Sequence, residues 1–341
     1  MFDLQPFIQT VLSGDSLSTN QAKEVFDGIM TGGCSDIHIS SLLTGLALRG
    51  ETIEEITGAV LAVRQKAKQI NTREGLIDTC GTGGDASQTY NISTAVALVT
   101  AACGVPVAKH GNRKASSQCG TADVLEELGV NLSANSAQIN KCLNDINICF
   151  LYAQNHHAAM KNVATVRREL GIRTIFNLIG PLANPAGAKY QLLGVFAAKW
   201  LEPVAQTLKL LGSKKAWVVH GSDGMDEITV TGPTAISQLE NNRVTNFRVE
   251  PSDAGLTMHS AESLRGGAPE YNAKALRELL QGAQSAYRDI VLMNTAAALV
   301  ISSTAQNLME GAIIAANAID SGKAEDTLNQ LIKISRGHSN G

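Results

Sequence analysis

The spacing of apolar residues changes character near residue 71. Before that point, apolar positions recur every three or four residues, which predicts amphipathic helices. Ser35 is placed to cap one of these segments, and Thr52 with Glu55 forms a capping box ahead of another. Beyond residue 71, short β-like runs alternate with helical stretches. This alternation predicts an α/β layer built on a mostly parallel sheet.

The expected elements of the second part are short. Strands are predicted at 76–80, 105–109, 148–153, 190–196, 215–220, 227–230 and 243–249. Helices are predicted at 92–104, 121–129, 136–145 and 203–212. The uncharged stretch 290–309 is long enough to span a membrane, but its Asn, Gln, Ser and Thr side chains favour a buried core helix. No membrane partner is therefore expected.

Composition and charge limit the class of protein. The chain has 341 residues, of which 44% are hydrophobic and 17% charged, with a formal net charge of −3. These values are typical of a globular protein of about two domains, and a nucleic-acid partner is not expected because it would call for a basic excess. The six cysteines show no C-x-x-C spacing and the N-terminus has no basic leader, which favours reduced thiols in a cytoplasmic protein.

A glycine-rich loop connects the first predicted strand to a helix, in the stretch DTCGTGGDASQTYNIST from Asp78 to Thr94. The strand is expected to end at Gly81, and Asn91 or Ser93 is suited to cap the helix. The glycines permit positive φ and leave backbone N–H groups uncovered, while the helix N-terminus adds the positive end of its dipole. The loop is therefore predicted to bind phosphate or pyrophosphate.

Two common nucleotide-binding motifs do not explain this loop. No Gly-Lys-Ser/Thr follows the glycines, so it is not a Walker A motif. Gly81, Gly83 and Ala86 match the G-x-G-x-x-A form of the dinucleotide fingerprint. That fold uses an acidic residue about 20 positions further on to hold the ribose, and the chain has no Asp or Glu between Asp85 and Asp123. The dinucleotide-binding interpretation is therefore disfavoured.

A basic, hydroxyl-rich loop follows the second predicted strand, from Lys109 to Ser117. Ligands of open α/β sheets bind at the carboxyl ends of the strands, so this loop and the glycine loop are expected to share one crevice. Taken alone, the same residues are equally consistent with a solvated basic turn in which His110 only satisfies the backbone.

Acidic and basic candidates also occur further along the chain. Asp226 and Glu227 follow the Gly224 turn and offer the oxygen ligands that Mg²⁺ prefers, although an isolated Asp-Glu pair is usually a solvated turn. Between residues 155 and 185, an amphipathic helix and a Gly-Pro crossover carry Arg167 and Arg168. These arginines are expected to lie on an ordinary solvated helix face, unless the segment 155–185 lines the crevice between the glycine loop and the basic loop.

The motifs, in this order, resemble the anthranilate phosphoribosyltransferase family of tryptophan biosynthesis. The resemblance rests on GTGGD at 81–85, NIST at 91–94, KHGNR at 109–113 with Ser116-Ser117, and Asp226-Glu227, and it covers essentially the whole chain. It implies a small helical domain, residues 1–72 with the crossover segment around 163–184. It also implies a larger α/β domain of the nucleoside phosphorylase/phosphoribosyltransferase type, residues 73–341, and a homodimer formed through the helical domain.

The resemblance further implies transfer of a phosphoribosyl group from phosphoribosyl pyrophosphate to the amine of anthranilate. It assigns Mg²⁺ to Ser93, Asp226 and Glu227, and contacts with anthranilate to Gly81, Asn112 and Arg167. Lys109, Asp85 and His110 are the candidates for catalytic roles, with His110 equally suited to a structural role. It assigns phosphoribosyl pyrophosphate to Gly81, Gly84, Asp85, Thr89, Asn91, Ile92, Ser93, Thr94, Lys109, His110, Gly111, Asn112, Arg113, Lys114, Ala115, Ser116, Ser117 and Thr121.

Some positions depart from the family pattern, and two alternative functions stay open. Ala86 replaces a usual glycine and Cys119 a usual serine, while Gln154, Ala158 and Thr165 replace prolines of the acceptor-side segment. A pyrimidine nucleoside phosphorylase shares the two-domain form and a Lys-containing loop, but it needs no Asp-Glu metal pair. A non-catalytic nucleic-acid-binding relative would carry a basic surface, which a net charge of −3 does not favour.

Overall fold

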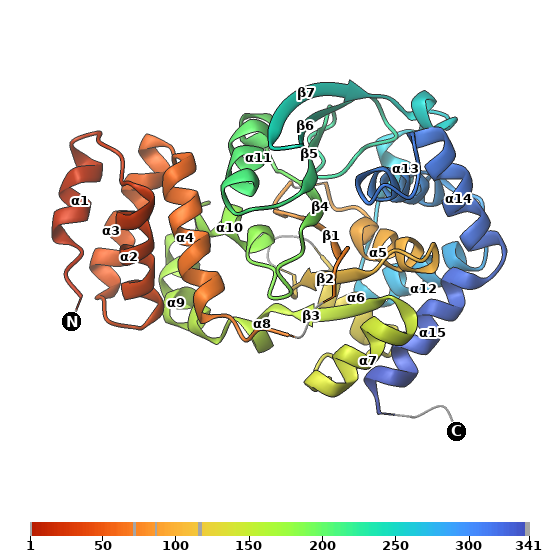
Figure 1. The fold of residues 1–341 in the computed structure, drawn as a ribbon, viewed down its shortest axis with the longest axis horizontal. Helices are drawn as coiled ribbons and strands as arrows, with labels where there is room; N and C mark the ends of the chain where they lie inside the picture. Colours follow the sequence, from red (N-terminus) through yellow and green to blue (C-terminus); the bar gives the residue numbers. More distant parts are fainter. Residues whose placement is uncertain (1, 71–72, 86, 115–117, 338–341) are drawn as a thin grey trace.

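The computed structural model describes residues 2–70, 73–85, 87–114 and 118–337. A small layer of helices at the N-terminal end lies beside a larger α/β layer (Figure 1). The small layer is formed by α1 (Gln5–Leu12), α2 (Thr19–Met30), α3 (Asp36–Arg49) and α4 (Ile53–Lys66). The larger layer contains the sheet, which confirms the predicted fold class.

Helix caps explain where the N-terminal helices begin. Ser35 accepts a hydrogen bond from the backbone of His38 at the start of α3. Thr52 and Glu55 form both bonds of the predicted capping box at the start of α4. After α4 the backbone of Lys68 is bonded to His156, with 2.8 Å between Lys68 N and His156 O. This bond fastens the end of the helical layer to the α/β layer.

Seven strands form one sheet in the order β3-β2-β1-β4-β5-β6-β7. The first five of this order pair in parallel, and β5, β6 and β7 pair antiparallel. The strands are β1 (Ile77–Gly81), β2 (Val107–Gly111), β3 (Ile148–Tyr152), β4 (Tyr190–Gly194), β5 (Lys215–Gly221), β6 (Thr234–Glu240) and β7 (Arg243–Val249). The chain first builds outward from β1 to β3 and then returns to β4, so the order reverses between β1 and β4. Ligands of such sheets bind at this reversal.

Helices cover both faces of the sheet. One face packs against α5 (Ile92–Ala102), α6 (Thr121–Glu127), α7 (Ser136–Ile146), α12 (Pro269–Leu280), α13 (Ala286–Ile301), α14 (Leu308–Asp320) and α15 (Lys323–Ser335). The other faces the N-terminal helices with α9 (Lys161–Leu170), α10 (Phe176–Leu182) and α11 (Leu201–Leu210). A short α8 (Ala153–His156) and four 3₁₀ turns, η1 (Ala158–Met160), η2 (Ala198–Trp200), η3 (Pro251–Ala254) and η4 (Ala261–Leu264), complete the connections.

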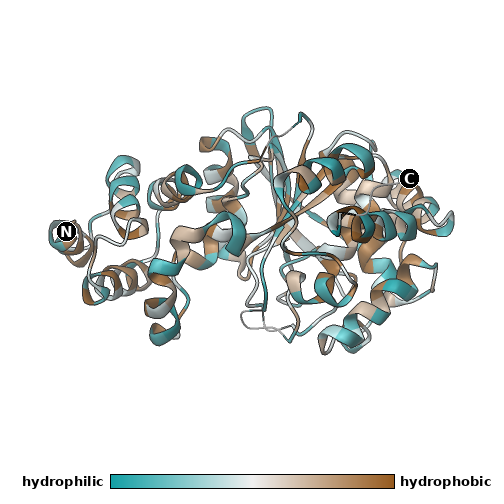
Figure 2. Cartoon of the chain, turned by 90° about the horizontal axis from the view of Figure 1, so that it is seen from below, coloured by the Kyte–Doolittle hydropathy of each residue, from teal (hydrophilic) through white to brown (hydrophobic). Residues whose placement is uncertain are grey.

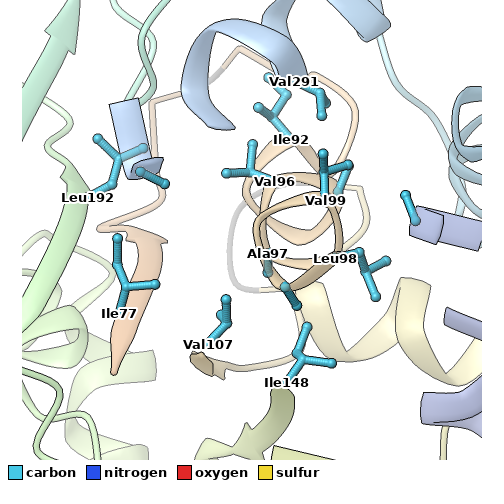
Figure 3. Close-up of a cluster of buried hydrophobic side chains, with 14 of the residues drawn as sticks. Ile77, Ile92, Val96, Ala97, Leu98, Val99, Val107, Ile148, Leu192 and Val291 are labelled. Atoms are coloured by element: carbon cyan, nitrogen blue, oxygen red, sulfur yellow. The ribbon is translucent and has the colours of Figure 1, made fainter. Parts of the chain in front are cut away.

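Side-chain alternation along the strands divides the hydrophobic core in two. Leu192 belongs to the cluster around α5, whereas the next residue, Leu193, belongs to the cluster shared with the N-terminal helices. Successive residues of a strand face opposite sides, so each buried strand serves both clusters. Figure 3 shows the first cluster with Ile77, Val107, Ile148 and Leu192 around α5. In Figure 2 the central strands are mostly brown and the outer helix faces are mostly teal.

Two of the predicted elements are wrong, and one strand was not predicted. Residues 227–230 form no strand, because the backbone N–H and C=O of Ile228 bond to the Asn294 side chain of α13 instead of a neighbouring strand. Strand β6 was not predicted, although its hairpin with β7 turns at Asn241-Asn242, both at positive φ as a two-residue turn requires. The stretch 290–309 is the end of α13, a turn, and the start of α14, which Asn307 caps.

The six cysteines are not joined in disulfides, in line with the expected reduced thiols. The described ranges contain no helix that combines the length and apolar character needed to cross a membrane.

Candidate active site

Glycines at the carboxyl ends of β1 and β4 allow an acidic turn to lie across the sheet. Gly81 and Gly194 pair in register. A Cβ added to Gly81 would clash with the carboxylate of Asp226, and one added to Gly194 would clash with the Asp226 backbone. The sequence therefore ends both strands in glycine where the Asp226 turn must pass. This is the position at which the strand order reverses.

The glycine loop is bonded directly to this acidic turn. Gly83 and Gly84 have φ values of 67° and 74°, which favour glycine. The N–H of Gly83 donates to Oδ2 of Asp226 at 2.7 Å, and the N–H of Asp226 donates to Oδ2 of Asp85 at 3.4 Å. The N–H of Thr82 donates to Gly194 O. The amides of Thr82 and Gly83 are therefore used within the protein, which corrects the expectation that they are uncovered.

Lys109 lies on β2 and is buried beneath the N-terminal end of α5. Its ammonium is buried and donates to Thr79 O at 2.6 Å and to Oγ of Ser93 at 3.1 Å. Burial lowers the pKa of Lys109, while the carboxylates of Asp78 and Glu227 oppose that shift. The backbone N–H of Ser93 bonds in turn to the Glu227 carboxylate. Lys109, Ser93 and Glu227 thus form one contact chain.

Within the described residues, the carboxylates of the acidic turn form no ion pair, and Lys109 offsets only part of the charge of Glu227. Burial, together with the negative charge of nearby Asp85, raises the pKa of Asp226 to about 7. Burial also raises the pKa of Glu227 well above its usual range, with Asp226 adding to the effect. Such a hard-oxygen pair is suited to Mg²⁺. Among the residues that the structure describes, no three His, Cys, Asp or Glu side chains gather around one metal position, so phosphate or water oxygens would have to complete the coordination.

The basic loop is only partly directed to this site. The Arg113 guanidinium donates to Asp123 at 3.0 Å, to Glu126 at 2.7 Å and to the hydroxyl of Tyr152 at 3.2 Å. It is therefore held by acids of α6, and its assignment to the donor stays a prediction. The N–H of Lys114 is bonded to Asp123 as well. Ala115, Ser116 and Ser117 lie outside the described residues.

The remaining donor-side candidates have mixed surroundings. Ile92 and Thr94 are buried, so their side chains belong to the core. Asn91 stands at the N-cap position of α5, but its side chain makes no cap bond and binds Cys119 and Asn272 instead, which corrects the capping role considered for it. Thr121 lies against Gly111, with 2.9 Å between its Cβ and a Cβ built on the glycine. Asn112 accepts from the N–H of Arg113.

His110 lies on the opposite side of β2 from Lys109, because neighbouring residues of a strand face opposite sides. Its ring centroid is 5.1 Å from that of His157, and its backbone N–H donates to Asp78. Burial lowers the pKa of His110 well below its usual range, and His157, His156 and Lys109 lower it further. His110 is therefore neutral and buried, which suits a structural role at least as well as that of a base.

Arg167 lies on α9, within the acceptor-side segment. Its guanidinium carbon is 5.2 Å from the Phe176 ring centroid, and burial lowers its pKa. No hydrogen bond or ion pair to an acid of the described chain satisfies it. A half-buried guanidinium without an acidic partner is suited to a carboxylate ligand.

Arg173 was not singled out from the sequence, yet it links the acceptor side to the glycine loop. Its guanidinium donates to Gly84 O and lies 4.5 Å from the Phe196 ring centroid. The N–H of Phe196 donates to Oγ1 of Thr82 in the same loop. No pattern distinguishes Arg173 from the neighbouring arginines, so only the fold reveals this contact.

Family models match both layers. Residues 5–67 match the helical bundle domain of a glycosyl transferase family, and residues 73–325 match its α/β domain.

Full-length relatives and solved structures agree with these matches. The chain is 54% identical to the anthranilate phosphoribosyltransferase of Rhodospirillum rubrum over 97% of this chain and 96% of the relative. It is 53% identical to that of Parvibaculum lavamentivorans over the full length of both. The Thermus thermophilus enzyme superposes with a TM-score of 0.92 at 39% identity, covering 97% of this chain and 99% of the other. The Saccharomyces cerevisiae enzyme in complex with phosphoribosyl pyrophosphate and Mg superposes with a TM-score of 0.90 at 29% identity, covering 98% of both.

Proposed function

The chain belongs to the anthranilate phosphoribosyltransferase family, and from that premise we propose which of its residues carry out the reaction. The enzyme transfers the phosphoribosyl group of phosphoribosyl pyrophosphate to the amine of anthranilate, giving N-(5-phosphoribosyl)anthranilate and pyrophosphate in tryptophan biosynthesis. A pyrimidine nucleoside phosphorylase and a nucleic-acid-binding relative are set aside, because the full-length relatives are transferases.

The donor is assigned to the glycine loop, the N-terminal end of α5 and the basic loop. The observation that carries this assignment is the bond between Gly83 and Asp226, because it brings the glycine loop and the acidic turn together over the reversal of strand order. The buried ammonium of Lys109 donates a hydrogen bond to the Ser93 hydroxyl and offsets part of the negative charge of Glu227. Arg113 would have to leave Asp123 and Glu126 to reach a phosphate.

Mg²⁺ is assigned to Asp226, Glu227 and Ser93. Their oxygen chemistry fits this ion, and the raised pKa values of Asp226 and Glu227 reflect carboxylates whose charge is poorly compensated within the protein. When bound, Mg²⁺ would supply positive charge to the departing pyrophosphate. A structure of the yeast relative in complex with phosphoribosyl pyrophosphate and Mg supports the same choice of ion.

The acceptor is assigned to the side of the site that faces α9, with Arg167 on its carboxylate and with Gly81 and Asn112 as further contacts to anthranilate. In the reaction the bond from ribose C1 to the pyrophosphate oxygen breaks, the bond from C1 to the amine nitrogen forms, and that nitrogen releases a proton. The amine becomes acidic only as the bond forms, so the main demands on the protein are stabilisation of the leaving charge and alignment of the amine.

The activity is tested by following anthranilate fluorescence with phosphoribosyl pyrophosphate and Mg²⁺ present. The proposal expects fluorescence to fall in step with pyrophosphate release, and only when all components are present. Pyrophosphate release without consumption of anthranilate would contradict the assigned acceptor. Phosphate-dependent cleavage of a pyrimidine nucleoside without either change would instead favour the phosphorylase.

We also propose a homodimer formed through the helical layer. Leu12 of α1 and Ile37 and Leu48 of α3 are exposed by 66%, 77% and 88%. Ile37 and Leu48 are separated by about three helical turns and so share one face of α3. Burying such side chains against a second copy would remove them from water.

The domain division proposed for the chain lies between residues 72 and 73, with the crossover segment 163–184 added to the helical domain. The packing of α9 against α2 and α3, and of α10 against α4, supports this grouping. Cytoplasmic residence is proposed from the biosynthetic activity together with six free thiols.

A further inference from the structure

A segment far along the chain, residues 264–272, borders the donor-binding loop. Thr89 forms an isolated antiparallel bridge with Arg265. The N–H of Gly266 donates to Gln88 O at 2.9 Å, and the N–H of Tyr90 donates to Leu264 O at 3.2 Å. A Cβ added to Gly266 would clash with the carbonyl group of Thr89. The backbone of residues 88–90 is therefore held against this segment much as one strand is held against another.

A relay of side-chain amides continues from this segment into both donor loops. The N–H of Gly267 donates to Oδ1 of Asn272 at 2.8 Å. Nδ2 of Asn272 donates to Oδ1 of Asn91 at 2.9 Å, and Nδ2 of Asn91 donates to Cys119 O at 3.1 Å. Asn91 ends the glycine loop, whereas Cys119 lies just before α6, two residues beyond the basic loop. The relay thus fixes the end of the glycine loop relative to the backbone at Cys119.

The direction of the relay is set by the backbone at each end. Gly267 offers an N–H, which only donates, and Cys119 offers a carbonyl oxygen, which only accepts. The side-chain amides of Asn272 and Asn91 lie between these two ends. If either amide flipped, so that its nitrogen and oxygen exchanged places, two donors or two acceptors would face each other. Asn272 is 1% exposed, so water cannot replace a lost partner at that position.

Aromatic packing holds the same junction. The ring centroid of Tyr90 lies 4.3 Å from that of Tyr287 and 5.9 Å from that of Tyr271, and both pairs are stacked. The hydroxyl of Tyr287 donates to Asn91 O at 3.2 Å. Asn91 is therefore bonded to α12 through its side chain and to α13 through its carbonyl group.

We propose that Asn272 is a positioning residue for the donor site, acting through Asn91 to hold the glycine loop at the distance from the backbone at Cys119 that binding of phosphoribosyl pyrophosphate requires. Its contact with the donor-binding residues is the bond to Asn91. This inference rests on the proposed function, which assigns both loops to the donor.

The test is Asn272→Asp, which keeps the size of the side chain but replaces the donating nitrogen with a second oxygen. That oxygen would face Oδ1 of Asn91, and the fixed ends of the relay prevent a compensating turn. The KM for phosphoribosyl pyrophosphate is expected to rise by about tenfold or more, while the KM for anthranilate stays within about twofold of wild type. The matched control is Asn329→Asp, the same chemical change at an exposed position of α15, for which both constants should be unchanged.

An unchanged KM for phosphoribosyl pyrophosphate in Asn272→Asp would overturn the inference, as would an equal rise in both constants. If that variant does not fold, Asn272→Ser decides in its place. The serine side chain is neutral and too short to bridge Gly267 and Asn91. The KM for phosphoribosyl pyrophosphate is therefore again expected to rise more than that for anthranilate. An equal rise in both KM values would contradict the positioning role. These outcomes leave the proposed function standing if wild type transfers phosphoribosyl groups to anthranilate, whereas no transfer by wild type would overturn both.

Discussion

The backbone N–H of Gly83 donates to Oδ2 of Asp226 at 2.7 Å, across 143 positions of sequence. Gly83 follows β1, and Asp226 follows β5, which is two strands away in the sheet. The turn that carries Asp226 reaches back over β4 because Gly194 leaves room for its backbone. The loop assigned to the phosphates and the acids assigned to the metal are thereby one bonded unit, so a change in either should be felt as a change in donor binding.

Neutralising both acids tests the metal assignment. Asp226→Asn combined with Glu227→Gln is expected to lower kcat/KM by at least about 100-fold at saturating Mg²⁺. The variant should nevertheless remain folded, because burial raises the pKa values of both carboxylates and so disfavours their charged forms in the protein. Steady-state rates and thermal unfolding measure the two effects.

The matched control for this pair is Glu325→Gln with Asp326→Asn, an adjacent acidic pair in the first turn of α15. It should leave both the rate and its dependence on Mg²⁺ unchanged. Near-normal turnover in the Asp226/Glu227 variant would show that the metal is held elsewhere.

A side chain on the glycine loop should interfere with the donor more than with the acceptor. Gly83 has a φ of 67° and no atom of the described protein lies within 4 Å of an added Cβ. Gly83→Val would therefore strain the backbone by about 1 to 2 kcal/mol and occupy space left for a ligand. We expect the KM for phosphoribosyl pyrophosphate to rise much more than that for anthranilate.

Gly14→Val separates strain from ligand exclusion. Gly14 has a φ of 90° and equally open space, but it lies after α1 in the helical layer. It should lower thermal stability without changing either KM. If calorimetry found unchanged binding of phosphoribosyl pyrophosphate to Gly83→Val, the glycine loop would be a structural turn and not a donor-binding element.

Most of the fold could be predicted from the sequence because strands and helix starts are marked by residues that lie close together in the chain. Runs of apolar residues mark the buried parallel strands, and the Ser35 and Thr52 caps mark helix starts. One error occurred where a distant residue decided the structure, and another where a local signal was overlooked. The apolar run at Ile228 meets Asn294 rather than a strand, whereas β6 was overlooked although alternation and the Asn241-Asn242 turn both indicate a hairpin.

The site was predicted less completely than the fold, for a related reason. Motifs identified the residue types at Gly83, Lys109 and Asp226, and the structure brings their segments together. Motifs did not show that Arg113 is held by Asp123 and Glu126, since that depends on where α6 packs. Arg173 and Asn272 act across 89 and 181 positions of sequence, and no local pattern encodes either contact.

Acid should destabilise the folded protein through His157. Burial, together with the neighbouring His156, lowers the pKa of this residue to about 4. Since the pKa is depressed on folding, the stabilisation is complete above about pH 6.5 and is lost as the pH falls toward 4. Between pH 7 and pH 5 this residue should reduce the free energy of unfolding by about 2 kcal/mol.

The neutral variant His157→Leu should remove that part of the pH dependence, as measured by urea unfolding at pH 7 and pH 5. Histidines His110 and His156 also have lowered pKa values, so some acid sensitivity should persist. If the variant and wild type lose equal free energy between the two pH values, His157 is not a source of the effect.

The proposed dimer predicts that charge on α3 separates the subunits. Ile37→Glu with Leu48→Glu would place two carboxylates in each half of the apolar contact, where burying each replaced side chain contributes about 1.5 to 3 kcal/mol. The variant is expected to sediment as a monomer at concentrations where wild type is dimeric. Met258→Glu, at another exposed apolar side chain outside the helical layer, should leave the association state unchanged. A variant that still dimerises would place the interface elsewhere.

Arg167 should decide how the enzyme recognises its acceptor. Anthranilate carries an ortho carboxylate, and a planar guanidinium in a partly desolvated site is well matched to it. Arg167 is half-buried beside Phe176, whereas its neighbour Arg168 is exposed on the outer side of α9. Loss of a charge-assisted hydrogen bond costs about 1.5 to 3 kcal/mol, or roughly 10-fold to 150-fold in affinity.

Arg167→Ala should lower the affinity for anthranilate by about that factor and leave donor binding nearly intact, while Arg168→Ala should lower it much less. Carboxylate recognition by Arg167 would be wrong if both variants behaved alike, or if wild type accepted a neutral aniline as readily as anthranilate.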